Sequence, residues 1–484
     1  MAASSLPAVA QNGQGAKPIE YLRACGLYGE GFWYIPGTDT CLRIGGQVQG
    51  DYGWNVSGGR MPQYSGDAGA QDRSASNYST RHLGDLTLDS RTQTGYGTLR
   101  SFVWFRVENQ DQGTVGVNNP RAFIQWAGFT FGRTRSSSDV LPGWDNQTML
   151  HQLPSGSDTS TTGTNQISYT WELGTGMALI VGAEERRFKP IANLSNLVVD
   201  AGRGPIDSHA GQVAPNPFVA FKVSQAWGRW DTSVTSNDVR ANYYTAPTPG
   251  FTACVGGNVG KTVCEYPSDK WGWAVASGAV INTPWIAPGD IFGVYGAYGV
   301  GASAYATGNN LTSPGLYGAG NNLALGAFTD AVYLNGTGLQ LTTGWSAGAY
   351  FTHFWTPQFS STVFGGHAAA SYNDTVTTGR WFCGGGGAAI QNVNLAPASA
   401  GAPCDPSFGL SVVGGRTDWY PVPSFRLGVE VMYTQIDTAF EGQQITLAST
   451  QGRRPTGIYT AKDQGITSVI FRAQRQWAAG EAGR

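Results

Sequence analysis

The chain has 484 residues and a formal net charge of −2 from 30 basic and 32 acidic residues, so no nucleic-acid partner is expected. Only 13% of the residues are charged, against about 25% in an average soluble domain, while 12% are aromatic and 69 are glycine. This composition argues against an ordinary soluble domain. It suits a chain with much of its surface facing lipid and with Trp and Tyr at the two headgroup layers.

The first residues resemble part of a leader. Residues 8–10 read Ala-Val-Ala, which resembles a cleavage site, but no charged region or long apolar segment precedes them. Either the true start of the precursor lies upstream or the leader has been removed, and we favour the first. We expect residues 1–16 to be a leader remnant or a disordered N-terminus.

No stretch as long as a membrane helix is predominantly apolar. Residues 271–289 lack charge, but Asn282, Pro284 and several glycines argue against a spanning helix there. If the chain lies in a membrane, it must form a closed barrel, because only closure satisfies every backbone polar group in hydrocarbon.

Two-residue alternation, in short runs broken by Gly, Asn, Asp and Pro, predicts β-strands throughout the chain. The apolar face would be the core of a soluble sandwich, whereas in a membrane barrel it would meet lipid and the polar face would line the lumen. The aromatic excess, the low charge and the lack of helical patterning favour the barrel. The clearest runs cover residues 42–52, 86–94, 99–108, 167–173 and 425–433.

Long polar stretches rich in Gly, Ser, Thr and Asn separate the predicted hairpins. A barrel uses about 10 residues for each membrane strand and pairs short turns with long loops, so this length accommodates about sixteen strands. No linker divides the chain into separate domains. The polar stretches are residues 53–80, 134–165, 189–216, 241–269, 303–335 and 373–407.

Six cysteines fall into three couples that are local in sequence. They show no CxxC spacing and no histidine at zinc-ligand distance, so we interpret them as disulfides that close loops in an oxidising compartment. Free buried cysteines are the alternative. The couples are Cys25 with Cys41, Cys254 with Cys264, and Cys383 with Cys404.

Signatures of catalysis and of cofactor binding are weak. Residues 344–348 match GxSxG, but that motif requires a strand-to-helix turn, and here it lies in an alternating aromatic-rich run. Residues 384–389 loosely resemble a dinucleotide fingerprint without its strand–helix context, and the five histidines show no metal-binding spacing. We expect no catalytic residue, no metal and no cofactor.

A series of segments in chain order carries a specific resemblance. Residues 21–52 read YLRACGLYGEGFWYIPGTDTCLRIGGQVQGDY. Together with the segments below, they resemble the alphaproteobacterial porin family over residues 17–477. The other segments are RTQTGYGTLR (91–100), RAFIQWAGFTFGR (121–133), VSQAWG (223–228), DKWGWAVASG (269–278), IAPGD (286–290), THFWTP (352–357), GGRTDW (414–419) and YTQIDTA (433–439).

The resemblance implies an all-β fold: a transmembrane antiparallel β-barrel of sixteen strands with an inward-folded constriction loop. It implies a homotrimer in the bacterial outer membrane, in contact with lipid and lipopolysaccharide, through which small hydrophilic solutes and ions diffuse passively. Some outer-membrane enzymes carry a Ser/His pair on the barrel exterior. The resemblance to porins, and not the spacing of residues, is our reason for not expecting such an enzyme here. Family members end on an aromatic residue, here Trp477, so residues 478–484 are expected to form a C-terminal tail beyond the barrel.

The family pattern places acids on the constriction loop opposite basic residues on the barrel wall. That loop is expected at residues 134–165, and a transverse field between the two groups would orient dipolar solutes. Alternatively, each arginine is paired with a lumen carboxylate, and Asp139 and Asp145 lie at the base of the loop. The loop acids are Asp139, Asp145 and Asp158; alternation points Arg43, Arg91, Arg100 and Arg106 into the lumen, and later Lys222, Arg426 and Arg472.

Two other functions remain open at this stage. One is a solute-specific channel, which saturable block of the current by one solute would reveal. The other is a structural or adhesive surface protein whose loops bind a partner, which would show no stepwise conductance in a planar bilayer.

Overall fold

The computed structural model describes most of the chain. The predicted leader remnant (1–16) and tail (478–484) lie outside the described residues, and so do Cys254, Asp145 and Asp158. Within the described part, no helix combines the length and the hydropathy needed to cross a membrane. The described residues are 23–57, 61–62, 76–111, 113–140, 148–150, 163–196, 207–245, 250, 264–308, 313–383, 393–395, 404–447 and 457–477.

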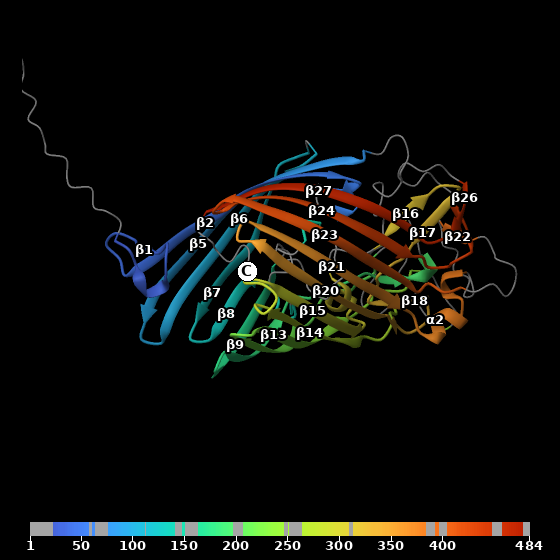
Figure 1. The fold of residues 1–484 in the computed structure, drawn as a ribbon. Helices are drawn as coiled ribbons and strands as arrows, with labels where there is room; N and C mark the ends of the chain where they lie inside the picture. The colour runs from blue at the N-terminus through green and yellow to red at the C-terminus, as the bar shows by residue number, and fades with distance from the viewer. Residues whose placement is uncertain are drawn as a thin grey trace, which may run out of the picture.

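Sixteen antiparallel strands of the described residues close into one barrel (Figure 1). Each pairs with the next in chain order, and β27 (Gln464–Trp477) returns to pair with β2 (Thr40–Trp54). Closure gives every strand two partners and leaves no exposed edge, as a lipid environment requires. The other strands are β5 (Tyr78–Thr94), β6 (Gly97–Gln110), β7 (Gly116–Trp126), β8 (Phe129–Thr134), β9 (Thr164–Gly174), β10 (Met177–Glu184), β12 (Asn216–Gln225), β13 (Gly228–Val239), β14 (Lys270–Asn282), β15 (Ile291–Val300), β20 (Thr343–Thr356), β21 (Phe359–Ser371), β23 (Phe408–Val422) and β24 (Phe425–Asp437).

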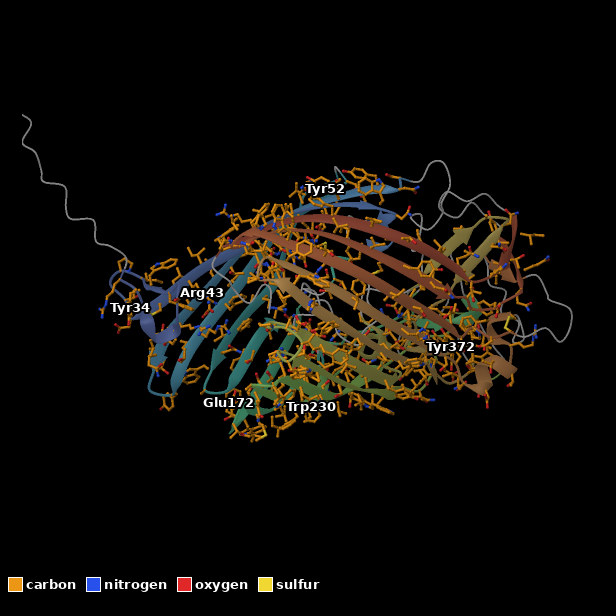
Figure 2. All side chains as sticks on the ribbon, in the orientation of Figure 1. Tyr34, Arg43, Tyr52, Glu172, Trp230 and Tyr372 are labelled. Carbon is orange, nitrogen blue, oxygen red and sulfur yellow. A yellow bond between two sulfur atoms is a disulfide. The ribbon has the colours of Figure 1, made fainter. Side chains whose placement is uncertain are left out.

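The two faces of the sheet carry the side chains that the alternation predicts. On β5, Asp85 and Asp89 point inward and are 3% and 2% exposed, whereas Leu86 between them points outward and is 43% exposed. Tyr52 and Trp230 lie on the outer surface (Figure 2). The predicted assignment of the apolar face to the exterior is therefore confirmed, because a period of two keeps one face of each strand apolar.

Most short turns gather at one end of the barrel and most long connections at the other. The turn between β7 and β8 is Ala127-Gly128, whose φ angles of 49° and 86° are the positive pair that a tight hairpin requires. Barrels of this class place short turns in the periplasm and long loops outside the cell. The end with the short turns is therefore the periplasmic end, and the other is the extracellular end. In chain order, loops 1 to 8 span residues 55–77, 111–115, 135–163, 185–215, 240–269, 301–342, 372–407 and 438–463.

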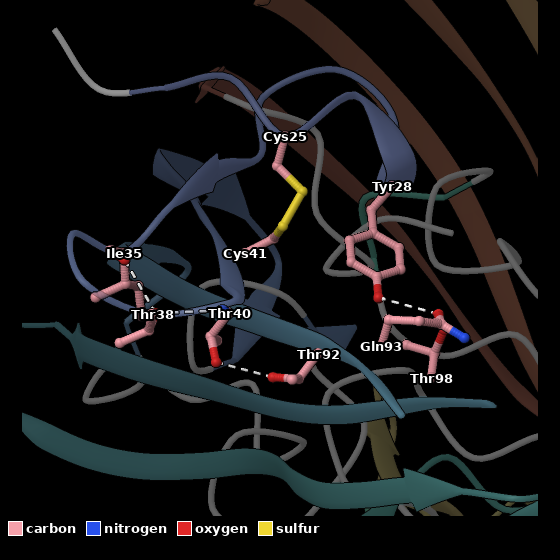
Figure 3. Close-up of a disulfide and its surroundings, with 9 residues drawn as sticks. All are labelled: Cys25, Tyr28, Ile35, Thr38, Thr40, Cys41, Thr92, Gln93 and Thr98. Carbon is pink, nitrogen blue, oxygen red and sulfur yellow. Dashed lines mark hydrogen bonds between the residues drawn. A yellow bond between two sulfur atoms is a disulfide. The ribbon is translucent and has the colours of Figure 1, made fainter. Parts of the chain in front are cut away.

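A disulfide holds the N-terminal segment against the periplasmic end. Cys25 bonds to Cys41 at the start of β2, and β1 (Trp33–Tyr34) pairs with β2 (Figure 3). The short helix η1 (Gly26–Tyr28) lies between the two cysteines. The predicted couple is thus confirmed, as is Cys383 with Cys404. Cys264 is also disulfide-bonded, and its predicted partner lies outside the described residues.

The extracellular loops fold into a cap with its own core, where the sequence predicts only polar connections. Leu316 and Phe328 of loop 6 share one buried apolar cluster with Leu410 and Ile436 on the inner wall. The cap therefore reaches into the barrel mouth. Its other elements are β3 (Val56–Ser57), β4 (Met61–Pro62), β11 (Ile191–Asn193), η4 (Leu194–Asn196), α1 (Ser303–Thr307), β16 (Gly315–Gly318), β17 (Asn322–Leu325), β18 (Ala331–Tyr333), β19 (Gln340–Leu341), α2 (Asp374–Thr378), η5 (Trp381–Cys383), β22 (Val393–Leu395), β25 (Gln444–Leu447) and β26 (Gly457–Ala461).

Loop 8 is not among the polar stretches that the sequence predicts. Apolar side chains such as Ile445 and Tyr459 interrupt its polar residues, and both are buried in the cap. They lie on β25 and β26, which join β16, β17 and β22 in one five-stranded sheet. This sheet is thus built from loops 6, 7 and 8, which only the fold brings together.

Candidate functional site

The tip of loop 3 is fixed to the barrel wall far from the strand where the loop begins. Loop 3 leaves β8, and its tip lies against β27 and β24, which are five and six strands away around the barrel by the shorter path. Glu430 of β24 accepts hydrogen bonds from the backbone N–H groups of Met149 at 2.6 Å and Leu150 at 2.9 Å. Arg472 of β27 donates to the carbonyl oxygen of Met149 at 3.0 Å. The loop therefore crosses the lumen.

An apolar seat on the inner wall holds the same tip. Met149 and Leu150 are fully buried. Gly428 makes room for the methionine, because a Cβ atom there would lie 2.1 Å from Met149 Cε. Packing and the hydrogen bonds to Glu430 thus hold the loop in one place. The apolar seat consists of Tyr295, Tyr350, Phe364, Val412, Met432 and Ile470.

Asp139, one of the predicted constriction acids, lies at the base of loop 3. Its carboxylate is 2% exposed and lies 3.0 Å from Arg187 and 3.7 Å from Arg135. Nearby, Ser136 donates a hydrogen bond to Glu184 at 3.0 Å. Asp139 therefore forms a buried ion pair where the loop leaves the wall, which is the alternative that the sequence leaves open. The other two predicted acids lie outside the described residues.

Three of the first four basic residues that alternation points into the lumen meet at one carboxylate near the periplasmic end. Arg43, Arg91 and Arg100 lie 3.4, 2.9 and 3.0 Å from the carboxylate oxygens of Asp89. Three arginines around one aspartate leave a net charge of +2. The ring of Phe32, from the N-terminal segment, covers this basic cluster on one side at 4.8 Å from Arg43 and 4.9 Å from Arg91.

The fourth predicted residue, Arg106, belongs to a belt of polar side chains further along the lumen. It donates to Asp85 at 2.7 and 2.8 Å and stacks over Trp104. Gln47 also donates to Asp85, at 2.5 Å. Arg106 is 4% exposed, so it is a buried, paired arginine.

The polar belt continues from β2 onto the neighbouring strands β27, β24 and β23. Gln474 of β27 donates to Gln47, and Arg426 of β24 donates to Gln474. Arg426 Nε lies 3.8 Å from Asp418, which Arg416 Nε approaches to 2.6 Å. The belt therefore alternates donors and acceptors from β6 to β23.

A cavity of about 360 Å³ opens in the lumen wall beside the belt. Gly428 and Glu430, which contact the tip of loop 3, follow Arg426 on the inner face of β24, so the cavity lies on the periplasmic side of the tip. Sequence reasoning misses Arg416, although it has the same strand parity as Asp418 within GGRTDW. The lining residues are Ile291, Thr352, Phe354, Ser360, Arg416, Tyr420, Ser424, Arg426, Gln474 and Gln476.

A third group of charges lies toward the extracellular end and is balanced. Arg81 donates to Glu108 at 2.9 Å and lies 3.7 Å from Asp51, and Arg472 donates to Asp51 at 2.6 Å. Sequence reasoning misses Arg81, although it lies on the same face of β5 as Asp85. Of these groups, the one with net positive charge around Asp89 lies toward the periplasm, and the balanced one lies toward the outside.

The residues behind the weak catalytic signals, the GxSxG serine and His353, occupy ordinary positions on barrel strands. Ser346, the serine of the GxSxG match, lies within β20 and donates to the carbonyl oxygen of Ala306 at 2.5 Å. His353 lies near the periplasmic end of β20 beside Trp355, and its Nδ1 is 2.7 Å from Asp290. In the part of the chain that the structure describes, no group of three His, Cys, Asp or Glu residues could hold a metal ion.

Known proteins resemble this chain in sequence and in fold. The family model described as the porin subfamily matches residues 13–470. Porin Omp2b of Brucella suis is 32% identical over 177 residues, which cover 34% of this chain and 44% of that protein. Porin Omp2b of Brucella abortus (strain 2308) is 31% identical over 179 residues, covering 34% and 45%. The sequence matches thus span less than half of these relatives.

Among solved structures, the outer membrane channel DcaP of Acinetobacter baumannii has a similar fold. The TM-score is 0.57 at 14% identity, and the match covers 92% of this chain and 99% of that chain. At this identity the likeness supports the barrel architecture and no detail of the lumen.

Proposed function

Because this chain belongs to the porin subfamily, we propose that it forms a water-filled channel in the bacterial outer membrane, through which small hydrophilic solutes and ions diffuse passively. The observation that carries the proposal is a closed barrel that is apolar outside and polar inside, with one loop fixed across the lumen. Such a channel needs no conformational cycle. Its wall charges replace part of the hydration of a passing solute, and loop 3 limits the size of that solute.

The predicted basic residues have two different roles in this proposal. Arg43, Arg91 and Arg100 supply the local charge of +2 around Asp89 and attract anions to the periplasmic half of the path. Arg106, which is buried and paired with Asp85, contributes to the rigidity of the wall. Asp145 and Asp158, the two predicted loop acids other than Asp139, supply the acidic side of the transverse field in this proposal.

Planar-bilayer recording tests the proposal directly. Purified, folded protein added to a lipid bilayer should produce stepwise increases of current with a linear voltage dependence at low voltage. Heat-denatured protein from the same preparation is the control. Folded protein without stepwise conductance would instead favour a structural or adhesive surface protein, which is the second candidate because loops 6, 7 and 8 form a folded cap.

The partners follow from the same proposal. The outer faces of β2, β5 and β6 carry a shallow groove that contains Gly50, Gly84 and the polar His82. A groove with an ionisable side chain suits contact with another copy of the chain better than contact with lipid tails, which supports a homotrimer. Lipid and lipopolysaccharide would cover the rest of the exterior. The mass of the detergent-solubilised protein, measured by light scattering, tests the trimer.

A further inference from the structure

We propose that the cavity beside Arg416 and Arg426 is a binding site for a small organic carboxylate that passes through the channel. The inference rests on the proposed channel function and adds a substrate class to it. The cavity is not needed to hold loop 3 in place, because the tip of the loop is held by Glu430 and packs against Gly428. Size selection by the loop therefore does not explain the cavity.

The charge around the cavity favours an anion. Two arginines line it, and no acidic residue is among its described lining residues. The carboxylate that they share, Asp418, is 1% exposed, so these three groups carry a net charge of +1. Glu430, which pairs with Arg416 across β23 and β24, accepts its hydrogen bonds from the backbone of loop 3. Among the described residues, Arg426 Nε has no hydrogen-bond acceptor. A carboxylate would bring the local charge to zero and would accept charge-assisted hydrogen bonds.

The neutral lining has donors for a carboxylate and an apolar side for the rest of the ligand. Gln476, Tyr420 and Ser424 contribute amide and hydroxyl groups on the side of the two arginines. Phe354 and Ile291 contribute apolar surface. This division favours a carboxylate that bears a short apolar or aromatic group over a fully hydrated inorganic ion. The volume of about 360 Å³ is within the usual range for small-molecule sites.

The other positive region of the lumen is a weaker candidate for such a site. At the basic cluster, Asp89 already accepts hydrogen bonds from Arg91 and Arg100. The ring of Phe32 also lies over the guanidinium groups of Arg43 and Arg91. These guanidinium groups therefore have both a carboxylate and an aromatic ring in contact, whereas Arg426, which donates to Gln474, also borders the open volume of the cavity.

Benzoate and its neutral isostere benzamide are suitable probes. Binding is measured by calorimetry on the detergent-solubilised wild-type protein, and block of the current is measured in bilayers. We expect benzoate to bind and to block, and benzamide to do neither. In Arg426→Gln the dissociation constant for benzoate should rise about tenfold, because one charge-assisted contact is lost. The matched control is Arg229→Gln, which removes one guanidinium from the inner face of β13, outside the cavity.

The outcomes test the carboxylate site and the channel function separately. Equal benzoate affinity in wild type and Arg426→Gln, or equal affinity for benzamide, would overturn the carboxylate site and leave the channel intact. Benzoate binding without any stepwise current would overturn the channel and leave the site. Two measurements show that each variant is folded. The unheated protein should migrate differently from the heated protein in gel electrophoresis, and its circular dichroism spectrum should be that of a β-sheet protein. If Arg426→Gln fails to fold, Arg416→Gln is measured at the same cavity with the same expectation.

Discussion

Replacing Glu430 with glutamine should release the tip of loop 3 without unfolding the barrel. The Glu430 carboxylate accepts two hydrogen bonds, from the backbone N–H groups of Met149 at 2.6 Å and Leu150 at 2.9 Å. A hydrogen bond to a charged group contributes about 1.5–3 kcal/mol, whereas a neutral one contributes about 1 kcal/mol. The amide oxygen of the substituted side chain would keep one neutral bond, and the second N–H group would lose its acceptor.

The charge of Glu430 is fully buried, so removing it also removes a desolvation cost and reduces the net loss. We therefore expect the docked tip to lose about 2 kcal/mol relative to the released tip, a shift of about 30-fold in the equilibrium. Packing of Met149 against the apolar seat remains, which limits the release to a minor population.

Hydrogen exchange measured by mass spectrometry reports the release directly. The amides of Met149 and Leu150 should exchange about 30-fold faster in Glu430→Gln than in wild type, because exchange follows the opening equilibrium. Open-channel current noise should rise in parallel. The control is Glu172→Gln, which removes the same charge from an exposed position on β9. Unchanged exchange at the tip in Glu430→Gln would refute the idea that this carboxylate holds the loop.

Three further perturbations test other parts of the molecule. Arg100→Gln lowers the net charge of the basic cluster around Asp89 from +2 to +1, so the reversal potential in a salt gradient should shift toward cation preference; an unchanged value would show that this cluster does not face the ion path. Cys383→Ser removes a cross-link that spans 21 residues of the cap, and the cap should lose about 3 kcal/mol and become sensitive to protease while the barrel stays resistant; equal protease resistance would contradict this. Burial raises the pKa of Asp330 in loop 6 to about 6, so the folded cap prefers the protonated acid, and cap stability should fall as the pH rises from about 4 to about 6 and then level off. Hydrogen exchange of the cap at pH 4.5 and pH 7 measures this change, and a pH dependence that survives in Asp330→Asn would show that Asp330 does not cause it.

Local sequence predicted the faces of the strands. Side chains alternate along a strand with a period of two, so the polar parity of residues 86–94 placed Asp89 and Arg91 in the lumen before any partner was known. The same parity placed Arg426 and Glu430 on the inner wall of β24. Cysteine spacing predicted two couples that the structure contains, because each closes a loop that is local in the chain.

Only the tertiary structure decided what those inward side chains do. Glu430 and Met149 are 281 residues apart, and no local pattern relates a strand carboxylate to the tip of a loop on the other side of the barrel. The same holds for the arginines that became a shared cluster, a buried belt or a cavity wall, since barrel closure and strand register determine their neighbours. The sequence determined which way each side chain points, because that direction depends on one strand alone. The contact partner of each inward side chain depends on segments that meet only when the barrel closes.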